Sequence, residues 1–130
     1  MIVLDASVLL ELLTGSPTGT LVAERLEARR AQLHAPHLID LEVAQVLRRF
    51  AVAGEFTRER GRAALDDLAD FPIHRHRHGV LLPRIWELRD SLTAYDAAYV
   101  ALAELLDAPL LTRDRKIQRA AVSEAVIELI

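Results

Sequence analysis

The chain has 130 residues, of which 52% are hydrophobic and 27% are charged, so it can bury a packed core and is neither disordered nor of low complexity. It contains no cysteine, which excludes disulfides, a thiol nucleophile and thiolate metal sites, so any metal must be held by oxygen or imidazole. The formal net charge of −3 argues against tight, non-specific binding to duplex DNA.

The first half of the chain alternates short apolar runs with longer helical patterns. In chain order we expect a strand at Met1–Leu4, helices at Ala6–Leu13 and Thr18–Arg30, a strand at Gln32–Ala35, and helices at Leu38–Ala53 and Thr57–Asp70. Pro36 closes the second strand, Gly54 ends the long helix, and Thr57 is a suitable cap for the next one. This half therefore predicts two strands, each followed by a pair of helices.

The second half continues the alternation. We expect a strand at Phe71–Arg75, helices at Val80–Ser91 and Ala94–Asp107, a strand at Pro109–Leu111, a helix at Arg113–Ala120 and a final strand at Ala125–Leu129. Strands separated by helices need crossover connections, which predict a mainly parallel sheet with helices on both faces. We therefore predict an α/β fold, a three-layer α/β/α sandwich with four or five short strands, formed by residues 1–130 as a single domain. Because no secretory signal or membrane-length apolar run is visible, we also expect a cytoplasmic protein.

Four acidic residues lie where a parallel sheet places its ligand site, at the carboxyl ends of the strands. Asp5 follows the first strand directly, and Asp114 follows the short strand at Pro109–Leu111. Asp96 lies in the first turn of the preceding helix, and Glu42 lies near the start of the long helix. Each aspartate also has a structural interpretation, as a helix cap or a first-turn residue that suits the helix dipole. Glu42 is the exception, because an acid at the edge of an apolar stripe needs a partner.

Taken together, the four acids predict a cluster of negative charge that must be compensated, which no single acid predicts. Two unit charges at 4 Å repel by about 4 kcal/mol at an effective dielectric constant of 20, so a cluster of four needs protons, arginines or a divalent cation. Oxygen ligands with open water positions suit Mg²⁺ or Mn²⁺. Such a site polarises a phosphoryl oxygen and activates a water molecule, which is the chemistry of phosphodiester hydrolysis.

Four segments in this order resemble the PIN-domain ribonucleases and, within them, the VapC-type toxins of bacterial type II toxin–antitoxin pairs. These segments are Ile2–Leu9 (IVLDASVL), Leu41–Leu47 (LEVAQVL), Leu92–Ala103 (LTAYDAAYVALA) and Leu110–Asp114 (LLTRD). Length and element order also match, so the resemblance covers the whole chain.

The resemblance implies a PIN fold and a Mg²⁺- or Mn²⁺-dependent endoribonuclease acting on structured or single-stranded RNA. The acidic residues of the family map onto Asp5, Glu42, Asp96 and Asp114, and all four are acids here. The hydroxyl beside the family's site maps onto Thr112, and Ser7 stands where a small polar residue is usual, so we expect both to position the carboxylates by hydrogen bonds. Attack by a metal-activated water would leave 5′-phosphate and 3′-hydroxyl ends. The resemblance also implies a homodimer and a cognate VapB-type antitoxin, which we expect to insert a basic residue into the acidic pocket.

Two basic segments are further candidates. Arg113, Arg115 and Lys116 flank Asp114 and either contact RNA phosphates or offset the acidic cluster. The run His74-Arg75-His76-Arg77-His78 is conceivable as a three-histidine metal site, or as an RNA contact through its arginines, but an exposed edge strand protected by charge is the favoured interpretation.

Three aromatic residues are candidates for stacking on RNA bases. Tyr95 and Tyr99 are four residues apart in one helical pattern, and Trp86 lies between Ile85 and Leu88. These positions favour packing in the core or in a dimer over contact with bases.

Three other functions are alternatives to a ribonuclease toxin. A receiver-type phosphoacceptor domain needs paired acids after its first strand and an aspartate at the end of its third, whereas Asp5 stands alone and Phe71–Arg75 ends without an acid. A non-catalytic PIN-like binding module would be signalled by loss of an acid, and none is lost. A PIN nuclease with a housekeeping role in RNA processing stays open, and an antitoxin reading frame next to the gene would argue against it.

Overall fold

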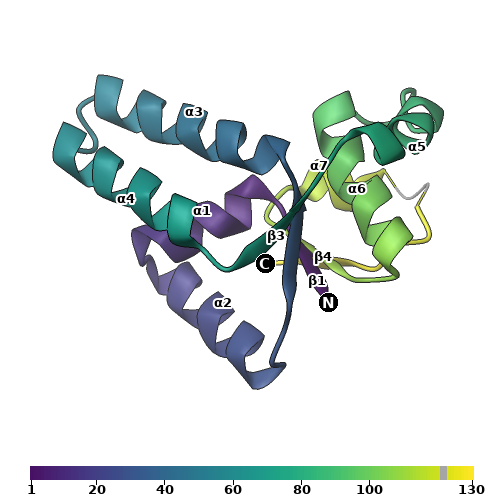
Figure 1. The fold of residues 1–130 in the computed structure, drawn as a ribbon, viewed down its shortest axis with the longest axis horizontal. Coiled ribbons are helices and arrows are strands. Elements are labelled where there is room, and N and C mark those ends of the chain that lie inside the picture. Colours follow the sequence, from purple (N-terminus) through teal and green to yellow (C-terminus); the bar gives the residue numbers. More distant parts are fainter. Residues whose placement is uncertain (121–122) are drawn as a thin grey trace.

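The computed structural model describes residues 1–120 and 123–130, in which short strands alternate with helices (Figure 1). The elements are β1 (Ile2–Leu4), α1 (Ala6–Thr14), α2 (Pro17–Ala28), β2 (Leu33–Pro36), α3 (Leu38–Val52), α4 (Arg58–Asp70), β3 (Ile73–His76), a 3₁₀ turn (Gly79–Leu81), α5 (Leu82–Glu87), α6 (Ala94–Leu106), β4 (Leu110–Thr112), α7 (Arg115–Arg119) and β5 (Ile127–Leu129). The alternation predicted from the sequence is confirmed, with shifts at the ends of several elements.

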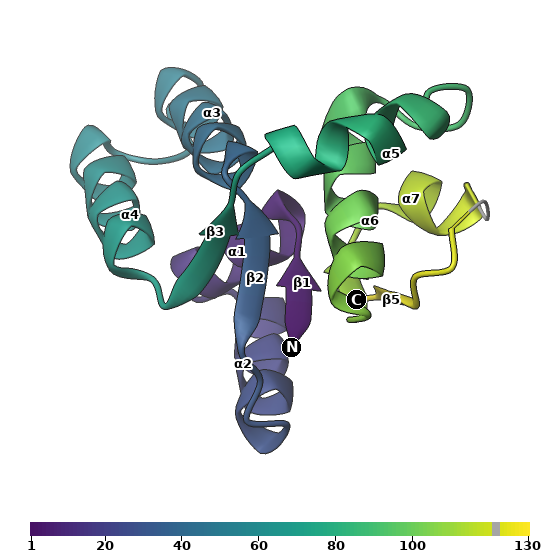
Figure 2. The ribbon, with the colours of Figure 1, turned by 45° about the vertical axis from the view of Figure 1, so that its right-hand side comes forward.

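The strands form one parallel sheet in the order β3-β2-β1-β4-β5. In the centre of the sheet, Val3 pairs with His34 of β2 and with Leu110 of β4. Helix α6 packs against β1 and β2 on one face with α5 outside it, whereas α1 to α4 gather on the other side of the strands (Figures 1 and 2). The predicted α/β fold, with a parallel sheet between two layers of helices, is therefore confirmed.

Local signals explain where the structure departs from the predicted boundaries. The Ser16 hydroxyl caps α2, and Pro17 occupies its first turn, so this helix starts before the predicted Thr18. The predicted helix over residues 80–91 is wrong in extent, because a 3₁₀ turn is followed by a short α5 that ends at Glu87. Pro83 lies in the first turn of α5, where its missing N–H costs nothing, and so marks a helix start inside the predicted helix.

The buried core runs through the middle of the sheet. All residues of β1 and β4 are buried, as expected for parallel strands covered on both faces. Residues 97–103 of α6 are buried without interruption against them. None of the helices in the described part of the chain is long and apolar enough to cross a membrane. The core fixes β1, β4 and α6 against one another, so the residues at their ends have defined relative positions.

Candidate functional site

Asp5 is a buried carboxylate held by two elements. It follows β1, caps α1 and is only 5% exposed. Its Oδ1 accepts hydrogen bonds from the Ser7 hydroxyl at 2.6 Å and from the Val8 N–H at 3.1 Å. Its Oδ2 accepts a hydrogen bond from the hydroxyl of Thr112, the last residue of β4. Burial raises the pKa of Asp5, and these hydrogen bonds act in the opposite direction, so the protein stabilises a charge that it has largely removed from water.

Thr112 links Asp5 to the second acid, Asp114. The Thr112 hydroxyl accepts a hydrogen bond from the Asp114 N–H at 2.9 Å while donating to Asp5. Asp114 caps α7, and its side chain accepts from the Lys116 N–H at 2.8 Å. Ser7 and Thr112 therefore both donate to Asp5, and Thr112 connects Asp5 to Asp114, while the role of both hydroxyls in the site stays a prediction.

Asp96 lies in the first turn of α6, whose N-cap is Thr93. The Thr93 hydroxyl accepts a hydrogen bond from the Asp96 N–H at 3.2 Å. Burial raises the pKa of the Asp96 carboxyl, and the negative charge of Asp114 raises it further. The capping arrangement and the approach to the other acids therefore occur together, so the structural and the functional interpretations of Asp96 do not compete.

Glu42 has the partner that its apolar surroundings require. Its Oε1 accepts a hydrogen bond of 2.5 Å from the phenol of Tyr99, a residue of α6 that is only 2% exposed. Burial raises the pKa of Glu42, and the Tyr99 hydrogen bond opposes that shift. The charges of Asp96 and Asp5 also raise the pKa of Glu42, so these carboxylates act on one another. Tyr99 was assigned to packing from the sequence; its ring is buried, but its hydroxyl also holds Glu42 in place.

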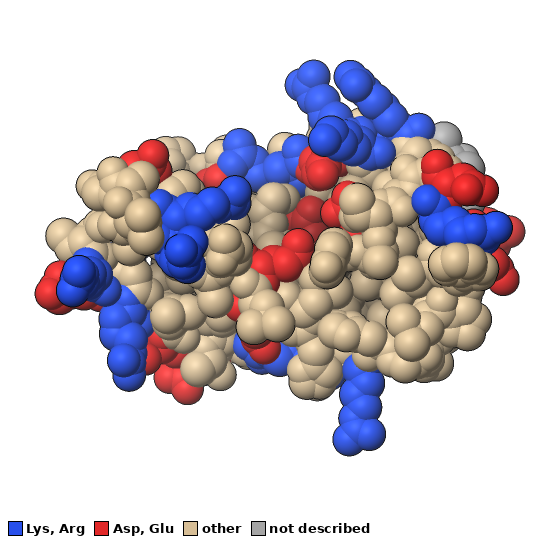
Figure 3. Space-filling view, turned by 90° about the horizontal axis from the view of Figure 1, so that it is seen from above, with Lys and Arg blue, Asp and Glu red and all other residues tan. Residues whose placement is uncertain are grey.

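One cavity of about 540 Å³ joins these residues. Its lining includes all four acids, Asp5, Glu42, Asp96 and Asp114, together with Ser7. Figure 3, a view from above Figure 1, shows carboxylate side chains in a hollow with basic side chains on either side. The structure therefore brings together the four acids that their positions beside strand ends had predicted, while their roles in binding and catalysis stay predictions.

The donors in the cavity match a hard divalent cation by their chemistry, since they are carboxylate and hydroxyl oxygens without sulfur or imidazole. Over residues 1–120 and 123–130, however, no three side chains of histidine, cysteine, aspartate or glutamate form a group that could hold a metal ion. The carboxylates thus share a cavity without forming a closed ligand shell.

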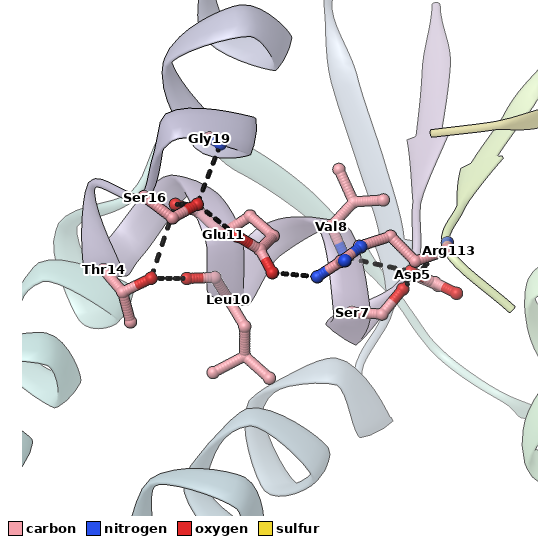
Figure 4. A network of polar contacts seen from close by, with 9 residues as sticks. All are labelled: Asp5, Ser7, Val8, Leu10, Glu11, Thr14, Ser16, Gly19 and Arg113. Carbon is pink, nitrogen blue, oxygen red and sulfur yellow. Dashed lines mark hydrogen bonds and ion pairs between the residues drawn. The ribbon is translucent and has the colours of Figure 1, made fainter. Parts of the chain in front are cut away.

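Arg113 is exposed, but its side chain is paired with a residue of the protein. Its guanidinium forms an ion pair with Glu11 of α1, and its backbone N–H donates to the Ser7 hydroxyl at 3.0 Å (Figure 4). Ser16 also donates to Glu11 and accepts from the Gly19 N–H at 2.9 Å. Glu11 was not singled out from the sequence, because its partner is 102 positions away and no local pattern marks the pair.

The other two basic candidates are also exposed. Arg115 and Lys116 lie on the first turn of α7, and none of the ion pairs among the described residues includes them. The positive charge of Lys116 lowers the pKa of Asp96 slightly against the larger effects of burial and of Asp114. Arg115 and Lys116 are therefore better placed to meet a phosphate than Arg113.

The histidine-rich run forms the edge strand that the sequence favoured, since β3 pairs only with β2. His74 stacks on His34, and His34 Nδ1 lies 2.9 Å from His76 Nε2. His78 instead follows the strand and accepts a hydrogen bond of 3.0 Å from the Leu38 N–H at the start of α3. His78 thus lies outside the strand that carries His74 and His76, and the described residues contain no three-histidine metal group.

Arg75, from the same run, is held within the protein. Its guanidinium forms an ion pair with Asp40 at 2.8 Å and donates to the Leu68 carbonyl at the same distance. These contacts tie β3 to α3 and α4, which leaves Arg75 badly placed for an RNA contact.

Two of the three aromatic candidates are not in the core. Tyr95 is 66% exposed and lines the cavity, and Trp86 is 68% exposed with the Arg89 guanidinium over its ring at 4.7 Å. Core packing is therefore wrong for both, and packing in a dimer, the other expectation, stays a prediction. Tyr95 lies in the first turn of α6, two residues before the buried stretch, and α5 has no buried residue, so the sequence spacing overstates the burial of Tyr95 and Trp86.

Comparison with known proteins agrees with this geometry. The family model of the PIN domain matches residues 2–123. Ribonuclease VapC1 of Mycobacterium tuberculosis is 39% identical over 129 residues, which cover 98% of this chain and 96% of the relative. Ribonuclease VapC9 of the same organism is 39% identical over 132 residues, covering 100% of this chain and 98% of the relative.

The fold is also shared with solved structures. The structure of VapBC2 from Rickettsia felis bound to a DNA fragment from their promoter contains a chain with a TM-score of 0.71 and 15% identity, covering 99% of this chain and 98% of that one. At this identity the similarity shows a common fold. The sequence relatives and the arrangement of strands, helices and carboxylates together show that this chain belongs to the PIN-domain family, among its VapC ribonucleases.

Proposed function

We propose that this protein is a Mg²⁺- or Mn²⁺-dependent endoribonuclease toxin that hydrolyses RNA to 5′-phosphate and 3′-hydroxyl ends. The observation that carries the proposal is the cavity that Asp5, Glu42, Asp96 and Asp114 all line, at the edge where β1 and β4 end. The names of its relatives support the activity, since VapC1 and VapC9 are ribonucleases. A cytoplasmic location and a single domain over residues 1–130 are part of the proposal.

We expect the residues of the site to have different roles in this reaction. Asp5, Asp96 and Asp114 would hold the cation, directly or through water, and Glu42 would help to hold it or orient the attacking water. A divalent cation supplies polarisation of a phosphoryl oxygen and a lowered pKa of bound water. Ser7 and Thr112 fix both oxygens of Asp5, and Tyr99 fixes one oxygen of Glu42, so these carboxylates need little reorganisation during the reaction. Arg115 and Lys116 would contact phosphates of the RNA.

The partners follow from the same site. The structures of VapBC2 and of a toxin–antitoxin complex from Klebsiella pneumoniae have similar chains, which supports an antitoxin partner here. An acidic cavity is neutralised electrostatically by a guanidinium or ammonium group, so we expect a VapB-type antitoxin to present arginine or lysine to the four carboxylates. A homodimer is also part of the proposal.

Metal binding is the first test of the proposed function. Binding to the folded state alone stabilises a protein by mass action, so Mn²⁺ at ten times its dissociation constant should raise the melting temperature by about 5 °C. Thermal unfolding of antitoxin-free protein, with millimolar Mn²⁺ or with EDTA, measures this shift, and the Asp5→Asn variant should reduce it. RNA cleavage should likewise require Mn²⁺ or Mg²⁺. Equal melting temperatures, together with cleavage that survives EDTA, would contradict the metal-dependent mechanism.

A further inference from the structure

The catalytic cavity has an apolar wall for which phosphodiester hydrolysis gives no reason. Beside the four carboxylates it is lined by Leu10, Leu38, Leu41, Val46 and Tyr95. Leu41 is 76% exposed and Tyr95 is 66% exposed. A cation and a phosphate need only polar partners, whereas exposed apolar groups gathered in a concave site are typical of a surface that a ligand covers.

Tyr95 occupies a defined place on this wall. It precedes Asp96 directly in the first turn of α6, so its ring stands at the rim of the cavity within one residue of a candidate metal ligand. None of the ring contacts and cation–π contacts among the described residues involves Tyr95. An aromatic face that is exposed and unused, next to a site for phosphate chemistry, is suited to stacking on a nucleobase.

An arginine of α3 also lines the cavity. Glu42, Gln45 and Arg49 follow one another at helical spacing along α3, and all three line the cavity. The rise of an α-helix places Arg49 about 10 Å beyond Glu42 along the helix axis. Arg49 is exposed and is absent from the ion pairs of residues 1–120 and 123–130. Its guanidinium is therefore available to a phosphate.

Carboxylates, an apolar wall and an arginine thus line one cavity, and we propose that this wall binds an unpaired nucleobase next to the scissile phosphate. Tyr95 stacks on the base, and Arg49 binds the phosphate of a flanking nucleotide. The cavity volume of about 540 Å³ lies within the range of small-ligand sites, which suits one nucleotide rather than a duplex. Bases in a duplex are already stacked and paired, so such a site would give a physical reason for the action on single-stranded RNA that the resemblance implies. This inference rests on the proposed ribonuclease function.

Kinetics with matched substrates and variants tests the base site. The substrate is a single-stranded RNA oligonucleotide that spans a cleavage site mapped with wild-type protein in total RNA. Of two further substrates, one carries an abasic residue beside the cut and the other is the same oligonucleotide annealed to a complementary strand. We expect the wild-type kcat/KM to fall about tenfold with the abasic RNA, the size expected for one base stacked on an aromatic ring, and at least as far with the duplex.

The variants separate stacking from other effects. Tyr95→Ala should lower kcat/KM about tenfold on the intact oligonucleotide, mainly through KM, and should leave the abasic substrate almost unaffected. Tyr95→Phe keeps the ring and should behave like wild type. Arg49→Gln should raise KM severalfold, whereas Arg48→Gln is the matched control, because Arg48 is an exposed neighbour on α3 that does not line this cavity.

The outcomes distinguish this inference from the function on which it rests. If wild-type protein with Mn²⁺ cleaves no RNA, the proposed function fails and the base site with it. Suppose instead that wild-type protein cleaves RNA. If Tyr95→Ala then lowers kcat/KM equally on the intact and the abasic oligonucleotide, or on neither of them, the base site alone is overturned. It is also overturned if Tyr95→Ala leaves RNA cleavage unchanged and instead weakens inhibition by the antitoxin, because the apolar wall would then be a protein-binding surface.

Discussion

Replacing Asp5 by asparagine should reduce RNA cleavage by about a hundredfold or more, as loss of a key electrostatic group in an active site usually does. The substitution keeps the size of the side chain but removes a negative charge that faces the candidate metal position. It also replaces an oxygen that accepts from Thr112 by an amide group that donates, which disturbs the hydrogen bonds between β1 and β4. Initial rates on one RNA substrate at saturating Mn²⁺ measure the effect.

The loss of activity must be separated from a loss of folding. We expect the free energy of unfolding of Asp5→Asn to change by less than about 1.5 kcal/mol, since the weakened hydrogen bonds are offset by removal of a buried charge. Asp66→Asn is the matched control, because Asp66 lies on α4 in an exposed ion pair with Arg62 and should be nearly neutral for activity and stability. Full activity of Asp5→Asn would remove Asp5 from the proposed mechanism.

The largest effect on stability is expected at Gly19. This glycine of α2 lies against α1, and a Cβ added to it would stand 2.0 Å from the Glu11 carbonyl oxygen and 2.6 Å from the Glu11 carbonyl carbon. Both atoms belong to the backbone of α1, so the clash cannot be relieved by a side-chain rotation. Gly19→Ala must push α1 and α2 apart, and the free energy of unfolding should fall by about 3 kcal/mol. Equilibrium denaturation with urea measures this change.

A second glycine supplies the control for Gly19. Gly61 lies in α4, and a Cβ added there meets nothing within 4 Å. Gly61→Ala should therefore leave the protein unchanged or stabilise it by up to about 1 kcal/mol, through the higher helix propensity of alanine. If the two alanine variants had the same stability, the close approach of α1 and α2 would be refuted. The comparison also bears on the site, because Ser16 and Glu11 connect this junction to Arg113.

Much of the fold was predictable, because local signals and hydrophobic patterns determine where its strands and helices form. The alternation of β-prone runs with helical patterns gave the α/β class, and crossover connections gave the parallel sheet. The strand order β3-β2-β1-β4-β5 was not predicted, since it depends on which crossovers pass the central strand. The boundaries of α2 and α5 shifted where Pro17 and Pro83 each occupy a first helical turn.

The acids of the site were predictable for a related reason. Their positions after β1 and β4 and at the starts of α3 and α6 are properties of the chain order, and a parallel sheet converts that order into proximity. The contacts between side chains that hold the site residues in place do not follow from chain order. Glu42 and Tyr99 are 57 positions apart, and Glu11 and Arg113 are 102 positions apart. Such contacts depend on how elements pack, which no local spacing encodes.

The ends of the cleaved RNA test the proposed chemistry most directly. Attack by a water molecule at the carboxylate cavity does not use the ribose 2′-hydroxyl, so wild-type protein with Mn²⁺ should leave a 5′-phosphate and a 3′-hydroxyl. The fragments can be assayed by ligation and by phosphatase-dependent labelling, with Asp5→Asn as the background control. A product ending in a 2′,3′-cyclic phosphate, formed equally well in EDTA, would mean that the 2′-hydroxyl is the nucleophile and would contradict metal-assisted hydrolysis by Asp5, Glu42, Asp96 and Asp114.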